Sequence, residues 1–214
     1  MSSNPCATTL SQASDAWSEL LDVIDPTDPD GERILAQADR LAVHRRGLLH
    51  RSVHVLFTRA TTADNSLELL LQRRSERKAI GPGRWDLTCA EHVTAGETFM
   101  DAARRGLYEE LHYRCDVHPE YPLQDWSGAP ARLQLYDYPE LGLADYEWNR
   151  LYRVHFPSVR AADDALRSLQ ADAAEVSAWQ WMPASSLRTQ LRDHPEAFTP
   201  WFRDQFHQHL PVCI

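Results

Sequence analysis

The sequence has little cysteine, no long apolar segment and no excess of positive charge. Its 214 residues include four cysteines, none in a CxxC pair, and the formal net charge is -9. Widely spaced cysteines predict reduced thiols in an intracellular, cytoplasmic protein. The negative charge argues against general binding to nucleic acid or to an anionic membrane, which would need a basic surface. We expect neither a membrane span nor a secretory signal, because residues 1–15 are polar and no run is long enough to cross a bilayer.

The order of apolar and polar residues predicts strands and helices in alternation. Period-two patterns and apolar runs predict strands at 20–24, 33–35, 50–57, 67–71, 85–93, 132–138, 148–156 and 179–182. Helical spacing predicts helices at 97–111, 184–192 and 200–209, and a helix or charged loop at 161–174. The run at 67–71 indicates a central strand. We expect a disordered N-terminus at 1–16, one α+β domain at 17–209 and a C-terminal tail at 210–214.

The predicted helix at 97–111 carries several carboxylates that could converge. Glu109 and Glu110 are adjacent and therefore point about 100° apart on a helix. Arg105 precedes Glu109 by one turn and can hold it in place, and Glu97 approaches from the preceding loop. Such a group of hard oxygen ligands suits Mg²⁺ or Mn²⁺. The simpler interpretation is a solvated acidic helix face with Glu109 in a surface ion pair.

The spacing of these residues resembles the Nudix box. That motif reads Gly, five residues, Glu, seven residues, and then Arg-Glu-apolar-x-Glu-Glu-x-Gly-apolar. The chain keeps six positions of that motif: Glu97, Arg105, Leu107, Glu109, Glu110 and Tyr113. It departs at three: Glu91 replaces the first Gly, Gly106 the Glu after the Arg, and His112 the last Gly. The resemblance extends over roughly residues 20–205 and implies an α/β/α sandwich with a mixed sheet. It also implies catalytic or metal-binding roles for Glu97, Arg105, Glu109 and Glu110.

A second set of possible metal ligands lies outside this motif. His44 and His50 precede or begin a predicted strand, His92 adjoins the box, and Glu147 belongs to a later strand. Each alone is more often a surface or core residue, but together they could bind Mn²⁺ or Zn²⁺. The set resembles the metal ligands of type I isopentenyl-diphosphate isomerase. That resemblance implies substrate-binding roles for five further residues: Arg40, Arg74, Lys78, Tyr136 and Trp201.

Two departures from the isomerase pattern concern its acid and base. Ala90 stands where that family has a Cys, and the neighbouring Cys89 should face the other side of a strand. Asn149 stands where a second Glu is expected, although a one-residue slip near Glu147 stays open. Alanine and asparagine cannot titrate, whereas the isomerisation needs an acid and a base on opposite faces of the substrate.

The chain is also similar to isomerase-like Nudix hydrolases, in residues 50–55, 85–88 and 90–97. Their box has the Glu that is Gly106 here, and its loss should slow hydrolysis unless Glu91 or His112 substitutes. The first hypothesis is a hydrolase that uses Mg²⁺ or Mn²⁺ to cleave a small nucleoside or prenyl-type diphosphate, acting as a monomer or homodimer. The alternatives are an isomerase and a non-catalytic diphosphate-binding module.

Overall fold

The computed structural model describes residues 17–61, 66–126, 131–132, 135–167, 169–170 and 172–209. The predictions of a disordered segment at 1–16 and a tail at 210–214 fall outside these ranges. Within the part described, no helix has the length and apolar character needed to cross a membrane.

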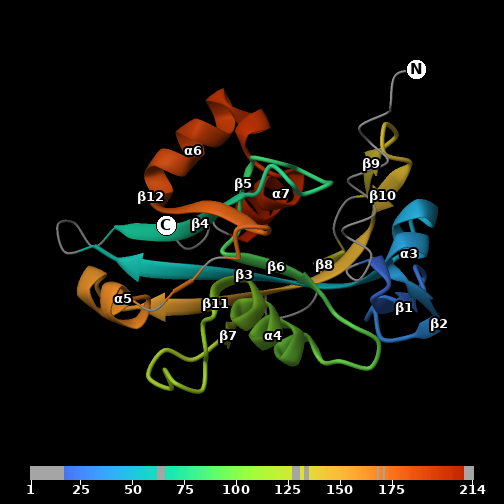
Figure 1. The fold of residues 1–214 in the computed structure, drawn as a ribbon, viewed down its shortest axis with the longest axis horizontal. Helices are drawn as coiled ribbons and strands as arrows, with labels where there is room; N and C mark the ends of the chain where they lie inside the picture. Colours follow the sequence, from blue (N-terminus) through green and yellow to red (C-terminus); the bar gives the residue numbers. More distant parts are fainter. Residues whose placement is uncertain are drawn as a thin grey trace.

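A mixed sheet forms the centre of the fold (Figure 1). Its main path runs in the order β12 (Val176–Pro183), β4 (Leu67–Arg74), β3 (His50–Ala60), β1 (Leu20–Ile24) and β2 (Ile34–Asp39). Off this path, β11 (Glu147–Phe156), β6 (Cys89–His92) and β5 (Trp85–Asp86) pair with β3 or β4, and β7 (Gln124–Asp125) and β8 (Ala131–Arg132) pair with β11. Strand β11 runs parallel to β3, whereas β4 and β6 run antiparallel to it. A separate hairpin consists of β9 (Tyr136–Tyr138) and β10 (Leu143–Asp145).

Helices cover both faces of the sheet. Helices α4 (Phe99–Leu111) and α5 (Val159–Ala165) lie on one face, and α6 (Ala184–Asp193) and α7 (Pro200–His209) on the other, with the short η1 (Pro195–Ala197) between them (Figure 1). Strand β3 contributes to both layers because its side chains alternate. Val55 and Phe57 pack in the core with α4, whereas Leu56 packs in the core with α6 and α7. The predicted α/β/α sandwich with a mixed sheet is confirmed.

Several elements differ from the sequence-based prediction, including strands β7 and β10, which were not predicted. A helix not predicted, α3 (Arg40–Arg46), begins where the Asp39 side chain accepts from the Ala42 N–H and ends at Gly47, whose φ is 57°. Its seven residues are too few for a clear helical period. The single strand expected at 132–138 is divided between β8 and β9. In the segment predicted at 161–174, the described residues contain one helix, α5, which begins earlier and ends at Ala165.

Candidate metal centre and substrate site

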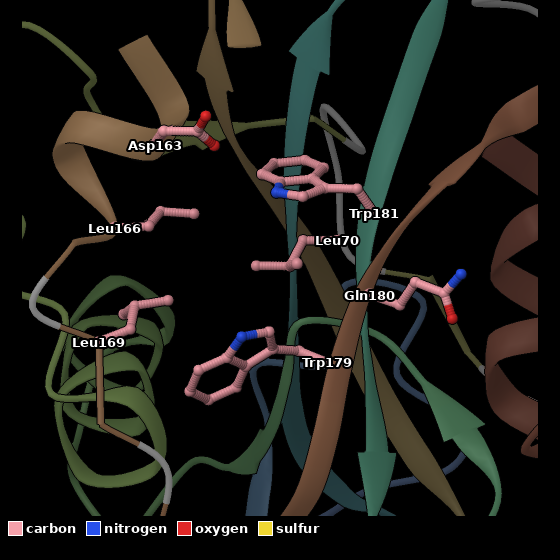
Figure 2. A pocket seen from close by; sticks show the side chains of 7 residues that line it. All are labelled: Leu70, Asp163, Leu166, Leu169, Trp179, Gln180 and Trp181. Carbon is pink, nitrogen blue, oxygen red and sulfur yellow. The ribbon is translucent and has the colours of Figure 1, made fainter. Parts of the chain in front are cut away.

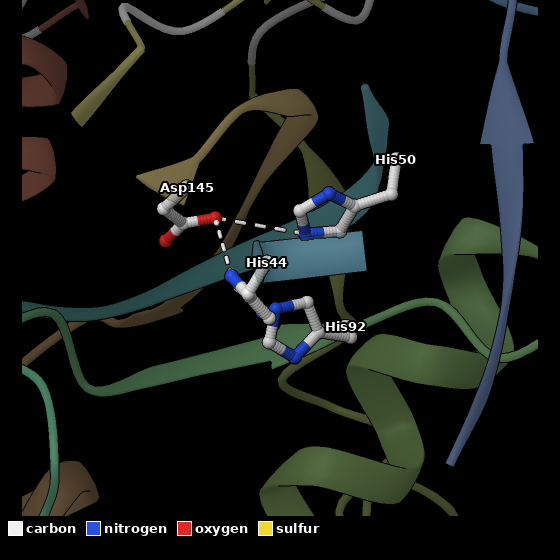
Figure 3. A group of neighbouring side chains, drawn as sticks. All are labelled: His44, His50, His92 and Asp145. Carbon is white, nitrogen blue, oxygen red and sulfur yellow. Dashed lines mark ion pairs between the residues drawn. The ribbon is translucent and has the colours of Figure 1, made fainter. Parts of the chain in front are cut away.

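Three histidines and an aspartate meet at one end of the sheet (Figure 3). His44 comes from α3, His50 from the start of β3, His92 from the end of β6 and Asp145 from the end of β10. Each offers a potential ligand atom, and these atoms all lie within 4.8 Å of one another. Strand register explains part of the convergence. Ser52 pairs with His92 across β3 and β6, and His50, two residues earlier on β3, shares the face of Ser52.

The inward-facing atoms of this histidine cluster have no hydrogen-bond partner among the described residues. Nε2 of His44, His50 and His92 and Oδ1 of Asp145 are buried in this state. Buried polar groups normally have partners, so their convergence indicates a site for a ligand. Backbone carbonyls fix two of the rings: Ala144 O lies 3.2 Å from Nδ1 of His44, and Leu48 O lies 2.9 Å from Nδ1 of His50. Such outer contacts orient imidazoles for metal binding.

Electrostatics keep these imidazoles in the neutral form that binds metal. Burial lowers the pKa of His44 to about 4. Burial also lowers the pKa of His50, and it lowers that of His92 well below its ordinary value. Neutral imidazoles and a carboxylate form a donor set that fits a divalent cation such as Mn²⁺.

Glu147, predicted as a ligand, lies beside this cluster. Its Oε1 is 3.9 Å from Nε2 of His92, and its Oε2 is 3.8 Å from Nε2 of His54. Burial raises its pKa well above the usual range, with the charge of Asp145 adding to the shift. The sequence reasoning missed Asp145, whose Oδ1 is 3.6 Å from Nε2 of His50. The spacing was a usable signal, because residues two apart in an extended chain point the same way.

Arg105 on α4, which we call the box helix because it carries most of the Nudix box, contacts several of the carboxylates around it. Its guanidinium donates to Glu97 at 3.0 and 2.9 Å, to Glu109 at 3.2 Å and to the carbonyl of His92 at 2.8 Å. Burial opposes ionisation of Glu97, but hydrogen bonds from Arg105 and Thr94 outweigh it and lower the pKa of this carboxyl. Glu97 and Glu109 are therefore held by the same guanidinium group, that of Arg105.

Glu110 faces a different environment from Glu109. It is buried, and its Oε2 accepts from Nε2 of Gln72 at 3.0 Å. Burial, helped by the charge of Glu91, raises the pKa of Glu110 to about 8. A second group of potential metal ligands among the described residues consists of Glu19, Glu91 and His92. Metal binding by Glu97, Glu109 and Glu110 remains a prediction.

The departures from the box have structural explanations. A Cβ added to Gly106 would lie 2.9 Å from Sγ of Cys89 and 3.0 Å from Cβ of Glu91. The Glu91 side chain thus occupies the space that a side chain at 106 would need, and its Oε2 lies 3.4 Å from Nη1 of Arg105. Cys89 is fully buried in the core with α4, on the face of β6 that the sequence predicted. His112 caps α4 with a φ of 54°, which explains the Gly expected there.

Three of the five predicted substrate-binding residues, Arg74, Tyr136 and Trp201, lie together, and the other two lie apart from them. Trp201 donates to Asp86 at 2.7 Å, and Arg74 pairs with Asp86 at 3.0 Å while lying 5.3 Å from the Trp201 ring. The Tyr136 ring lies 6.3 Å from that of Trp201. Asp86 adds to the raised pKa of Glu147, so this group is within electrostatic reach of the histidine cluster.

The two remaining basic residues have acidic partners. Lys78 pairs with Glu175 and lowers the pKa of Glu110 against the larger effect of burial. Arg40 lies 3.7 Å from Glu19 and 5.3 Å from the Trp17 ring. Arg40 also adds to the lowered pKa of His92, which burial dominates, so it faces the cluster from α3.

A pocket of about 250 Å³ lies elsewhere, between β12 and the segment around α5 (Figure 2). Leu70, Leu166, Leu169, Trp179 and Trp181 provide most of its wall. Its one carboxylate, Asp163, is 3.3 Å from Arg59. Trp179 is 36% exposed, whereas Trp148 is buried. None of the predicted site residues lines this pocket.

Comparisons with known proteins agree with this architecture. The model of the NUDIX domain matches residues 48–202. An isopentenyl-diphosphate Delta-isomerase of Burkholderia multivorans is 30% identical over 171 residues, covering 80% of this chain and 84% of that protein. An isopentenyl-diphosphate Delta-isomerase of Halorhodospira halophila is 30% identical over 190 residues, covering 87% and 93%.

Solved structures with the same fold are more distant in sequence. DR0079 from Deinococcus radiodurans superposes with a TM-score of 0.59 at 18% identity, covering 89% of this chain and 99% of that one. The NUDIX domain of Shewanella oneidensis NrtR, complexed with ADP ribose, has a TM-score of 0.51 at 15% identity, covering 78% and 88%. At these identities the likeness concerns the fold alone.

Proposed function

Since the chain belongs to the Nudix family, we propose that it is a divalent-metal-dependent hydrolase of a small diphosphate-containing substrate. The observation that carries the proposal is the histidine cluster. Its buried nitrogen and oxygen atoms lie close together and have no hydrogen-bond partners among the described residues. His44, His50, His92 and Asp145 would hold Mn²⁺ or Mg²⁺, with Glu147 as a further ligand. Once bound, such a cation neutralises phosphate charge and lowers the pKa of a coordinated water.

The side chains around the cluster suit the two parts of such a substrate. Arg74 and Lys78 offer cationic donors for phosphate oxygens, and Arg can do so with two parallel hydrogen bonds. Both now pair with carboxylates, and a phosphate group would compete for these cations. Trp201 and Tyr136 offer aromatic surface for the organic part. The names of the curated relatives favour a prenyl diphosphate as the first compound to test.

A hydrolysis assay tests the proposal. Purified protein with Mn²⁺ or Mg²⁺ is incubated with isopentenyl diphosphate, dimethylallyl diphosphate, ADP ribose and a nucleoside diphosphate, and the release of phosphate, or of AMP and ribose 5-phosphate from ADP ribose, is measured. We expect release that depends on the metal and falls by about a hundredfold or more in Asp145→Asn, because the cation loses its carboxylate. Glu196→Gln is the matched control, since Glu196 is an exposed acid beside a histidine, His194. Metal-independent release, or no release from any compound, would contradict the hydrolase.

Isomerisation is the second candidate function. The spacing of Asp145 and Glu147 favours it, because a carboxylate in the histidine cluster is followed two residues later by a Glu. The isomerase resemblance predicts such a pair of carboxylates, two residues apart, at positions 147 and 149. Ala90, which lies opposite His54 in the sheet, argues against it, since it cannot carry a proton. Proton NMR of isopentenyl diphosphate distinguishes the two functions: conversion to dimethylallyl diphosphate without phosphate release would favour the isomerase. Thermal stabilisation by the diphosphate without turnover would favour the binding module.

A further inference from the structure

Behind Glu147 lies a buried polar network that none of the predicted roles uses. Ser52 and His54 come from β3, Asn149 from β11 and Gln205 from α7. Each of these four side chains is at most 2% exposed. Polar groups buried so deeply are costly unless they are paired, and a network of this kind fixes the orientation of its members.

The contacts of Gln205 determine the tautomer of His54. Nε2 of Gln205 donates to Oδ1 of Asn149 at 2.7 Å and lies 3.1 Å from Nδ1 of His54. In this orientation of the Gln205 amide, Oε1 is buried without a hydrogen-bond partner among the described residues and the nitrogen donates, so Nδ1 of His54 accepts and the ring proton is assigned to Nε2. That Nε2 lies 3.8 Å from Oε2 of Glu147. The C-terminal helix therefore turns an N–H of His54 towards Glu147.

Ser52 holds the same carboxylate from a second side. Nδ2 of Asn149 donates to Oγ of Ser52 at 2.8 Å, so the hydroxyl proton of Ser52 is left for another acceptor. A hydrogen bond from Ser52 to Glu147 lowers the pKa of Glu147 against the larger effect of burial. With these contacts from Ser52 and His54, Glu147 keeps Oε1 on the side of His92, at 3.9 Å from Nε2.

We propose that Gln205, acting through the Nε2–H tautomer of His54, aims Glu147 at the histidine cluster. His54 is then a positioning residue: its N–H sets the direction of a carboxylate that completes the metal centre. The inference rests on the proposed metal-dependent function, and it assigns to α7 a part in building the metal centre. It explains why a histidine, and not an apolar residue, lies opposite Ala90 in the interior of the sheet.

Two substitutions of His54 separate positioning from packing. In His54→Gln the side-chain amide nitrogen can replace Nε2–H, whereas in His54→Asn it can reach only the position of Nδ1. Both variants lose the ring, so both should unfold at similarly lowered temperatures. Calorimetric titration with Mn²⁺ alone should give an affinity within about threefold of the wild type for His54→Gln. For His54→Asn it should be about ten- to a hundredfold weaker, as for other outer contacts of metal ligands. Equal affinities of the two variants would overturn the proposal.

The tautomer itself is measurable without metal or substrate. Imidazole ¹⁵N shifts of the metal-free protein should show His54 protonated at Nε2, and Gln205→Glu should shift the proton to Nδ1, because a carboxylate accepts where the amide donated. Protonation at Nδ1 in the wild type would refute the role of Gln205. Neither measurement uses turnover, so a failure of the hydrolase assay leaves both results interpretable.

Discussion

The histidine cluster and the carboxylates of the box helix are two groups of potential metal ligands in one fold, but they differ in how far their polar atoms are hydrogen-bonded within the protein. In the cluster, Nε2 of each of the three histidines is buried without a hydrogen-bond partner among the described residues. Around α4, Glu97 and Glu109 are held by Arg105, and Glu110 accepts from Gln72. The first group is incomplete without a ligand, whereas the second is complete within the protein.

This difference indicates that the residues of the Nudix box and the residues that would gain most from a bound metal are not the same. A buried donor or acceptor without a partner costs about 1–3 kcal/mol, so the cluster gains most from a bound cation. The box carboxylates gain less, because a cation would first have to displace Arg105 or Gln72. The hydrogen bonds of the motif therefore stabilise the loop and helix, whereas the proposed requirement for metal comes mainly from residues outside the motif.

The largest expected effect is on metal affinity. His50→Gln should weaken Mn²⁺ binding by at least about a hundredfold, or about 2.7 kcal/mol, because an inward-facing ligand nitrogen is lost. His155→Gln is the matched control, since His155 is a partly buried histidine that lies 3.0 Å from Thr58, outside the cluster. Calorimetry with Mn²⁺ measures both variants. If His50→Gln binds Mn²⁺ as tightly as His155→Gln, the contrast between the two regions is wrong.

A smaller effect concerns the stability of the metal-free protein. In the folded protein, burial raises the pKa of Glu110 from its ordinary value of 4.5 to about 8. The folded state therefore holds its proton more tightly, and the free energy of unfolding should fall as pH rises from 4.5 to 8. Glu110→Gln keeps an acceptor for Gln72 but never ionises. We expect it to stabilise the protein by roughly 2 kcal/mol at pH 8 and by almost nothing at pH 4.5. Urea unfolding with EDTA at both pH values measures this, and a destabilised variant at pH 8 would contradict it.

Local spacing made part of this site predictable. Arg105 and Glu109 are one helical turn apart, so their contact follows from the geometry of α4 alone. The layers of the sandwich likewise follow from alternation in strands such as β3. The gathering of His44, His50 and His92 was only a hypothesis from the family resemblance, because they come from α3, β3 and β6.

Contacts between distant segments were beyond sequence reasoning. Asp145 joins the histidines through the path between β10 and β11, and its spacing of two residues from Glu147 was the one local signal for it. Gly106 and Glu91 are complementary only because β6 packs on α4, where the side chain of one fills the space above the other. Glu109 and Glu110 are neighbours with the same charge, yet only Glu110 is buried, since the direction of α4 against the sheet decides which of them faces inward.

Glu97 should show the opposite pH dependence from Glu110, although both belong to the same motif. Its pKa is lowered by hydrogen bonds from Arg105 and Thr94, despite burial. Its stabilising contribution is therefore present above the ordinary pKa of 4.5 and is lost as pH falls through its folded pKa. Glu97→Gln removes one charge from the Arg105 pair and should cost about 1 kcal/mol at pH 7, since the partners are partly exposed. Metal-free unfolding between pH 7 and pH 3 tests the sign: the cost should decrease as the pH falls through the folded pKa of Glu97. A cost independent of pH would mean that Arg105 holds Glu97 by shape and not by charge. The carboxylates of the box helix would then be less stabilised by Arg105 than their hydrogen bonds indicate.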